Sequence, residues 1–273
     1  MKDPLKNKAP RPAVGGRNQA RFVMHVDNAL ARKLTAFGPL GSDDAEMLNV
    51  LQKARTSISA GKEVVYEGQQ RHSAYILLSG WAFSYKRLRD GGRQIVDIQI
   101  PGDFLGLRSV LLRNADHGFT MLTDVEVSKV TPEMVNNVFS HTPRLGLALL
   151  WAASRDEAMV VEHMVSIGRR DAPERIIHFL LELGARLNLI GVGSGDSYAC
   201  PISQSILADT LGLTAIHVNR VLRQLREAKI LVFRGGIVTF PDIERASALT
   251  GFDLGYLDHG SRAWRGPAGD RAV

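Results

Sequence analysis

Residues 207–230, LADTLGLTAIHVNRVLRQLREAKI, carry an apolar pattern of helical period that is broken once, at Gly212. Glycine is common just past a helix end because it adopts the left-handed backbone conformation without strain. Ser203 and Thr214 stand where they can cap the helices on either side of this break. The following residues, ILVFRGGIVTF, are typical of two short strands joined by Arg-Gly-Gly. This order predicts a winged helix-turn-helix.

The second helix of such a unit enters the major groove of DNA, and the residues at its start reach the base edges. Asparagine can pair with adenine and arginine with guanine, whereas small or apolar side chains can meet the thymine methyl group. From residue 220 to residue 229, four basic residues stand against one acidic residue, which favours phosphates as partners. The candidate DNA-binding residues are Ser203, Gln204, Thr214, Ala215, Ile216, His217, Asn219, Arg220 and Arg223. The alternatives are a helical hairpin with a solvated charged face, or one that binds another protein.

The whole chain sets further limits. Its 273 residues are enough for two domains, and a net charge of +6 fits a polyanionic partner without requiring one. A single cysteine, Cys200, excludes a disulfide within the chain and a four-cysteine iron–sulfur cluster. No stretch approaches the ~18 consecutive apolar residues of a membrane helix, so we expect a cytoplasmic protein with no membrane partner. We find no nucleophile with a matching base, no metal-ligand set and no phosphate loop, so we expect neither an enzyme nor a metal site.

The first half of the chain contains three kinds of sequence in succession. Residues 1–27 are basic and rich in proline and glycine, which predicts a disordered arm or, alternatively, an arm that touches DNA phosphates. Residues 28–136 begin as helix and continue as short β-rich pieces, KEVVYEG, SAYILLSGWAFSYKRL, RQIVDIQI and DVEVSKV. The turn RDGGR between two of these pieces is a strong hairpin signal. We expect a small antiparallel β-roll with a short helix over LGLRSVLL inside it.

Residues 137–170 return to the helical period, and Pro143 suits a first helical turn. One apolar stripe runs along this helix and consists of Leu149, Ala153, Val160, Met164 and Ile167. The helix has more apolar surface than one small β-roll needs, so we predict that the stripe binds a second copy of the chain. Packing within the monomer is the alternative. Residues 171–250 contain the winged helix-turn-helix, and residues 251–273 have the composition of a loose tail.

Two segments, with one long helix between them, carry a resemblance to a known family. They are VYEGQQRHSAYILLSGWAFSYKRLRDGGRQIVDIQIPGDFLGL and LADTLGLTAIHVNRVLRQLREAKIL. The chain resembles the Crp/Fnr family of bacterial transcription regulators over residues 28–250. The resemblance implies an α+β protein with an N-terminal antiparallel β-roll of the cyclic-nucleotide-binding type, a long dimerisation helix and a C-terminal winged helix-turn-helix. It also implies a homodimer that binds a palindromic promoter site in double-stranded DNA and contacts RNA polymerase.

The effector region departs from the family pattern. Cyclic-AMP-binding members place an Arg-Ser or Arg-Thr pair where this chain reads RNADHGFTML, and PGDFLGLRSV lacks the expected glutamate. We therefore expect neither cyclic AMP nor an iron–sulfur cluster, and we predict no cofactor. A haem held by His72 and His117, an unknown small effector and the absence of any effector are left open, as is a redox role for Cys200.

The recognition helix departs from the pattern as well. Many relatives place a glutamate where Ile216 stands and a serine where Asn219 stands, whereas Arg220 matches. Isoleucine cannot accept a hydrogen bond from cytosine as glutamate does. We therefore expect Arg220 to read a guanine within a half-site that differs from the usual one of the family.

Overall fold

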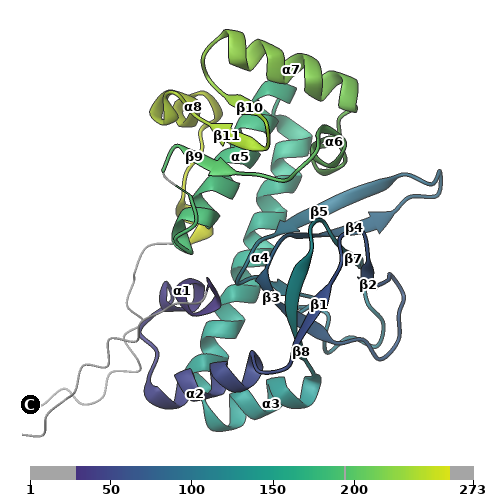
Figure 1. Cartoon of the computed structure of the whole chain (residues 1–273), viewed down its shortest axis with the longest axis vertical. Helices are drawn as coiled ribbons and strands as arrows, with labels where there is room; N and C mark the ends of the chain where they lie inside the picture. Colours follow the sequence, from purple (N-terminus) through teal and green to yellow (C-terminus); the bar gives the residue numbers. More distant parts are fainter. Residues whose placement is uncertain (1–28, 194, 259–273) are drawn as a thin grey trace, which may run out of the picture.

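The computed structural model describes residues 29–193 and 195–258. A β-roll lies beside one long helix, α4 (Pro143–Arg169), and a C-terminal helical unit adjoins the roll at the far end of that helix (Figure 1). The predicted α+β fold class, an antiparallel β-roll followed by a long helix and a helix-turn-helix with a wing, is confirmed. The arm predicted over residues 1–27 and the part of the predicted tail from residue 259 to 273 lie outside the described residues. Within those described ranges, no helix is long and apolar enough to span a membrane.

Two antiparallel four-stranded sheets form the β-roll, with strand orders β1-β8-β3-β6 and β2-β7-β4-β5. Leu77 and Val127 from the first sheet are buried together with Phe119 from the second, so the core of the roll lies between the sheets. The strands are β1 (Arg55–Ile58), β2 (Glu63–Val65), β3 (Ala74–Ser79), β4 (Ala82–Arg87), β5 (Arg93–Gln99), β6 (Phe104–Leu105), β7 (Gly118–Met121) and β8 (Val125–Val130).

The turns of the roll test two predictions. The RDGGR hairpin is confirmed, since it joins β4 and β5, and Leu88 N–H donates to the Gly92 carbonyl at 2.8 Å. The short helix over LGLRSVLL is wrong, because residues 107–111 form turns. Val110 is buried there, whereas Leu111 is 74% exposed. The apolar run therefore does not supply the continuous buried face that a helix inside the roll would need.

Three short helices lie at the end of the roll that faces α4, and they are α1 (Ala29–Thr35), α2 (Ser42–Leu51) and α3 (Pro132–His141). The single helix predicted over residues 137–170 is divided at Thr142, whose φ of −130° and ψ of 67° lie outside the helical region. A proline disfavours helical geometry in the residue before it, so α4 begins at Pro143. The first half of α4 shares a buried cluster with α1, in which Leu145 and Ala148 lie with Leu30 and Leu34.

The C-terminal unit contains α5 (Ala172–Leu189), α6 (Gln204–Leu211), α7 (Ala215–Glu227) and α8 (Ile243–Thr250). Its small antiparallel sheet has the order β10-β11-β9, with β9 (Ser197–Ala199), β10 (Val232–Arg234) and β11 (Ile237–Thr239). The tail predicted to be loose from residue 251 is ordered over residues 251–258. This segment contains the short 3₁₀ helix η1 (Gly255–Leu257), in which Leu257 is fully buried. The segment 251–258 packs against α4 and α5. Composition alone does not reveal such contacts.

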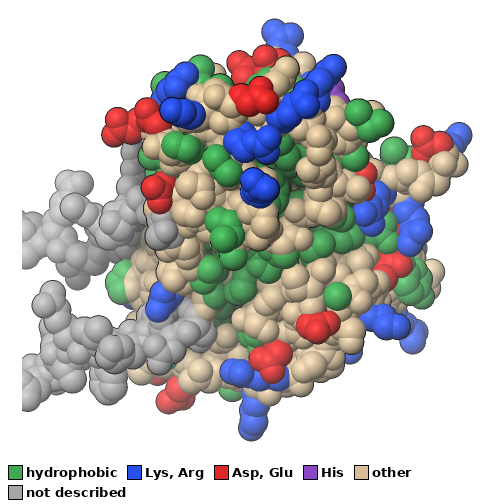
Figure 2. All heavy atoms as spheres, turned by 45° about the horizontal axis from the view of Figure 1, so that its top comes forward, with side chains coloured by type: hydrophobic (Ala, Val, Ile, Leu, Met, Phe, Trp, Pro, Cys, Tyr) green, Lys and Arg blue, Asp and Glu red, His purple; other side chains and the backbone are tan. Residues whose placement is uncertain are grey.

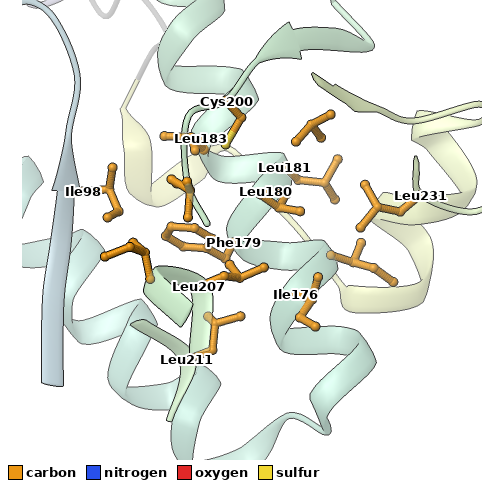
Figure 3. Close-up of a cluster of buried hydrophobic side chains, with 14 of the residues drawn as sticks. Ile98, Ile176, Phe179, Leu180, Leu181, Leu183, Cys200, Leu207, Leu211 and Leu231 are labelled. Atoms are coloured by element: carbon orange, nitrogen blue, oxygen red, sulfur yellow. The ribbon is translucent and has the colours of Figure 1, made fainter. Parts of the chain in front are cut away.

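The β-roll and the C-terminal unit share one apolar core. Ile95 and Ile98 of β5 belong to the same buried cluster as Phe179 of α5 and Leu207 of α6. Figure 3 shows Ile98 on its strand facing Phe179, with Leu207 and Leu211 close by. The face of the sheet that carries β5 is therefore packed directly against the helices of the C-terminal unit.

Candidate nucleic-acid interface

The helix pair α6–α7 is held by the residues at its own helix ends. The Ser203 hydroxyl accepts a hydrogen bond from Ile206 N–H, and the Thr214 hydroxyl accepts one from His217 N–H, both at 3.2 Å. Gly212 between the helices has a left-handed backbone with a φ of 64°. The two predicted caps and the predicted helix break are confirmed, and the start of each helix is fixed locally.

Helix α7 has one buried and one exposed face. The buried face consists of Val218, Val221, Leu222 and Leu225. The exposed face consists of Ile216, Asn219, Arg220 and Arg223, with Ala215 and His217 partly exposed beside them. Ile216 is 85% exposed although it is an apolar residue. The residues predicted to meet DNA on α7 are therefore on its solvent side.

The starts of α6 and α7 are joined by a polar contact. Asn219 Nδ2 donates to Gln204 Oε1 at 2.9 Å, and both side chains are at the surface. Ser203 is exposed next to Gln204. The two helices therefore present a common polar surface, to which each contributes its first turn or two.

Basic side chains follow α7 toward its end. Arg220, Arg223, Arg226 and Lys229 are all exposed. Figure 2 shows Lys and Arg side chains gathered at this end of the molecule, with hydrophobic side chains in a band across the middle of the same face. Arg223 Nε lies 3.9 Å from a Glu227 carboxylate oxygen, and both side chains are about two-thirds exposed, so this ion pair is weak. The surface of α7 can therefore offer cations to a polyanion.

Two contacts from the β-roll hold α6 in place. Arg93 Nε donates to Asp209 Oδ2 at 2.8 Å, and Gln94 Nε2 donates to the Thr210 carbonyl at 3.0 Å. Sequence reasoning assigned Arg93 and Gln94 only to the end of a hairpin. Their partners lie 116 residues further along the chain, and no local pattern signals such a contact.

Of the five residues predicted to form a dimer face on α4, Leu149 is buried within the monomer. Leu149 is only 3% exposed and belongs to the monomer core with Leu145 and Ala152, so it is not available on the surface. Met164 is 67% exposed and Ile167 is 36% exposed. Ala153 and Val160 are partly exposed. The large apolar side chains that α4 leaves in solvent are Leu150, Val161, Met164, Val165 and Ile167.

A small polar cavity lies within the β-roll beside α4. Its lining includes Asp97, Gln99, Asp103, His117 and Asp156, and its volume is about 20 Å³. That volume holds about one water molecule, whereas ligand pockets are typically about 300–1,000 Å³. Neither a haem nor a cyclic nucleotide fits this cavity as the structure stands.

The two histidines considered as haem ligands are buried and bound to their own chain. His72 Nε2 lies 2.7 Å from the Ser109 carbonyl oxygen, and His117 Nδ1 lies 2.7 Å from an Asp116 carboxylate oxygen. The His117 ring also lies 4.7 Å from the ring of Phe119, measured between centroids. One ring nitrogen of each histidine is therefore engaged within the chain itself.

Cys200 is buried just before α6. Burial raises the pKa of its thiol to about 12, and only 1% of the residue is exposed. The thiolate is the reactive form of cysteine, so burial and the raised pKa both disfavour reaction of Cys200 in the folded chain.

Comparison with known proteins identifies the architecture. A family model for the Crp-like helix-turn-helix domain matches residues 174–245, and one for the cyclic nucleotide-binding domain matches residues 55–142. The nitrogen fixation regulation protein FixK of Bradyrhizobium diazoefficiens is 34% identical over 199 residues, which cover 71% of this chain and 81% of that protein. The chain belongs to the Crp/Fnr family of transcription regulators.

Further relatives agree with this assignment. The transcriptional activatory protein AadR of Rhodopseudomonas palustris is 30% identical over 220 residues, covering 80% of this chain and 90% of that protein. The solved structure of FixK2 from Bradyrhizobium japonicum has a TM-score of 0.65 at 28% identity and covers 72% of this chain and 96% of that one. As a Crp/Fnr regulator, the chain is a DNA-binding transcription factor and not an enzyme.

Proposed function

We propose that this Crp/Fnr regulator binds as a homodimer to a two-fold symmetric promoter site, with one α7 helix in each of two major grooves. The observation that carries the proposal is the solvent face of α7. It places arginine, asparagine and isoleucine side chains in its first two turns, over a buried face made of valine and leucine. This is the face that a recognition helix presents to base edges.

Base reading is assigned to three side chains of this face. The Arg220 guanidinium can donate two parallel hydrogen bonds to guanine N7 and O6. Asn219 gives one N–H to Gln204, which leaves its second N–H and its oxygen for an adenine. Ile216, whose side chain stands in solvent, suits the methyl group of a thymine.

The remaining candidate residues are assigned to the phosphate backbone. Ser203 and Gln204 lie at the start of α6, and Thr214, Ala215 and His217 lie at the start of α7. Backbone N–H groups and the helix dipole favour phosphate at such positions. Arg223 lies one turn beyond Arg220 and adds positive charge that is exposed to solvent.

The exposed row on α4 supports the homodimer. Val161, Met164 and Ile167 leave apolar surface in solvent on one chain, with Ala153 and Val160 at its edge. Pairing this face with its copy would bury that surface in the manner of a coiled coil. The two α7 helices would then meet half-sites about one helical turn, ~34 Å, apart.

The proposed dimer needs neither cyclic AMP nor an iron–sulfur cluster. A single cysteine cannot supply the thiolates of such a cluster, and the cations beside the roll cavity are already paired with carboxylates, Arg186 with Asp97 at 3.0 Å and Lys33 with Asp103 at 2.8 Å. Both cations are therefore already neutralised within the chain, and the cavity beside them is small. Contact with RNA polymerase and a cytoplasmic location are proposed on the basis of the family.

Arg220→Ala tests the base-reading role, with Arg226→Ala on the same helix as the matched control. Binding is measured on the preferred duplex and on versions in which each base pair is changed in turn. We expect Arg220→Ala to lose about 1–3 kcal/mol on the preferred duplex and to lose discrimination at one position of each half-site. Arg226→Ala should weaken all duplexes alike and reduce the salt dependence.

Two outcomes would contradict the proposal. If Arg220→Ala weakened all sequences equally, Arg220 would be a phosphate contact and not a base reader. If wild-type binding did not weaken as salt rises, the counterion release that accompanies DNA binding would be missing. The helix-turn-helix would then be a protein-binding surface.

A further inference from the structure

A cluster of charged side chains is buried where the C-terminal unit meets the β-roll. Arg186 of α5 reaches Asp97 at 3.0 Å and Asp103 at 2.7 Å, and it donates to the Ile98 carbonyl at 2.8 Å. Its side chain is fully buried. Lys33 of α1 lies 2.8 Å from the other oxygen of Asp103, and its side chain is 1% exposed. Cations from α1 and α5 therefore meet on carboxylates of the roll.

The same cluster extends to α4. His163 Nε2 lies 3.0 Å from both Glu182 carboxylate oxygens, and His163 Nδ1 lies 3.3 Å from the Val96 carbonyl oxygen of β5. Glu182 also lies 3.6 Å from Arg186 on its own helix. Through His163, the helix α4 is thus linked both to the strand β5 and to a buried carboxylate of the helix α5.

The C-terminal segment closes this cluster from outside. The Tyr256 hydroxyl donates to Glu182 Oε2 at 2.9 Å, and the Tyr256 ring stacks on His178 with a centroid distance of 6.0 Å. Asp258, two residues after Tyr256, accepts a hydrogen bond at its Oδ2 from Trp151 Nε1 of α4 at 2.6 Å. Residues 251–258 therefore run from α8 across α5 and back to α4.

Buried charges of this kind are costly to separate from their partners. A buried ion pair gains little net free energy over an apolar pair, but removing one partner leaves an uncompensated charge and costs about 3–5 kcal/mol. If α5 turned away from the roll, Asp97 and Asp103 would lose Arg186, and Glu182 would lose His163. The observed arrangement of the two units gives each of these charges a partner of opposite sign.

We propose that this buried cluster, closed by residues 251–258, holds the DNA-binding unit in one orientation on α4 and the β-roll, with Arg186 and Tyr256 as positioning residues for DNA binding. The inference rests on the proposed dimer, because α4 carries the pairing face and α5 carries the helix-turn-helix. Fixing α5 on α4 fixes the distance between the two recognition helices. The protein is thereby set to accept one spacing of half-sites.

Tyr256→Phe tests the closing contact, since it removes the hydroxyl that reaches Glu182 and keeps the ring on His178. Tyr66→Phe is the matched control, because Tyr66 is 60% exposed on the roll. The first readout is binding to duplexes whose half-sites are moved apart or together by one base pair. Loss of a hydrogen bond to a charged group should reduce the spacing preference of Tyr256→Phe about tenfold or more, whereas Tyr66→Phe should keep the wild-type preference.

The second readout is amide hydrogen exchange of β5 and α5 without DNA. We expect at least about tenfold faster exchange at this junction in Tyr256→Phe than in Tyr66→Phe. Arg186→Met, if it folds, should unfold in two calorimetric transitions where the wild type shows one.

Unchanged exchange and unchanged spacing preference in Tyr256→Phe would overturn the inference. If the wild type bound no DNA at all, the proposed function would fail, and the exchange measurement would still decide whether the junction is held by this cluster. The two failures are therefore distinguishable.

Discussion

Raising the pH from 6.5 to 9 should remove stability through one histidine. Burial alone would lower the pKa of His163, but the Glu182 carboxylate beside it, together with Asp97 and the Val96 carbonyl, raises that pKa to about 9. A group with a raised pKa in the folded chain contributes stability that is complete below its ordinary pKa of about 6.5. That contribution is lost as the pH rises through the folded value.

The size of the effect follows from the shift. Each unit of pKa difference corresponds to about 1.4 kcal/mol, so a rise from 6.5 to about 9 corresponds to about 3 kcal/mol. The free energy of unfolding should therefore fall by about 1 kcal/mol per pH unit between pH 7 and pH 9. His178 does not contribute in this range, because burial lowers its pKa to about 4.

Urea unfolding followed by tryptophan fluorescence measures this slope at a fixed protein concentration. His163→Gln should lose most of the pH dependence, since an amide does not titrate. His141→Gln is the matched control, because His141 is exposed on α3 and should keep the wild-type slope. Equal slopes in wild type and His163→Gln would refute the assignment of the buried imidazolium, as would a stability that rises over this range.

Three further changes have defined outcomes. Thr214→Ala removes the hydroxyl that caps α7 and should lower the free energy of unfolding by about 1 kcal/mol. Thr214→Ser keeps a hydroxyl at this position and should have the stability of the wild type. Equal stability of the two variants would contradict the cap. Met164→Glu places a charge in the exposed row of α4 and should convert dimer to monomer in sedimentation, whereas an unchanged dimer would place the interface elsewhere. Cys200 should react with a thiol reagent only after denaturant is added, because it is 1% exposed and its thiol stays protonated; immediate reaction in the folded protein would contradict its burial.

Features encoded by neighbouring residues were predictable from the sequence. Ser203, Gly212 and Thr214 set the ends of α6 and α7 through contacts within three to four residues, so their residue types already determine the geometry. The hairpin between β4 and β5 is equally local, because glycine supplies the turn. The family resemblance added the order of the units, and the comparisons confirm it.

The face of a helix that binds another chain was less predictable. Leu149 and Leu150 are neighbours with the same chemistry, yet the first is 3% exposed in the monomer core and the second is 55% exposed. Helix α4 is apolar on more than one side, and periodicity does not say which side its own chain covers. The loss of the helix over LGLRSVLL has a similar cause, since an apolar run can end in a turn that buries only part of it.

The buried cluster between the units lay beyond sequence reasoning. Asp103 is 70 residues from Lys33 and 83 from Arg186, and no local pattern connects the three. Charged residues are usually solvated, so the sequence gives no reason to expect these three in the interior. Only the packing of β5 against α5 brings them together.

The central claim is that two copies of α7 read a symmetric DNA site. The most direct test is selection of bound duplexes from a random DNA pool by the purified full-length protein, without added small molecules, followed by sequencing. The account predicts a two-fold symmetric motif with half-site centres about one helical turn apart and a guanine at the position read by Arg220. Enrichment of a single half-site without symmetry, or no enrichment at all, would contradict it.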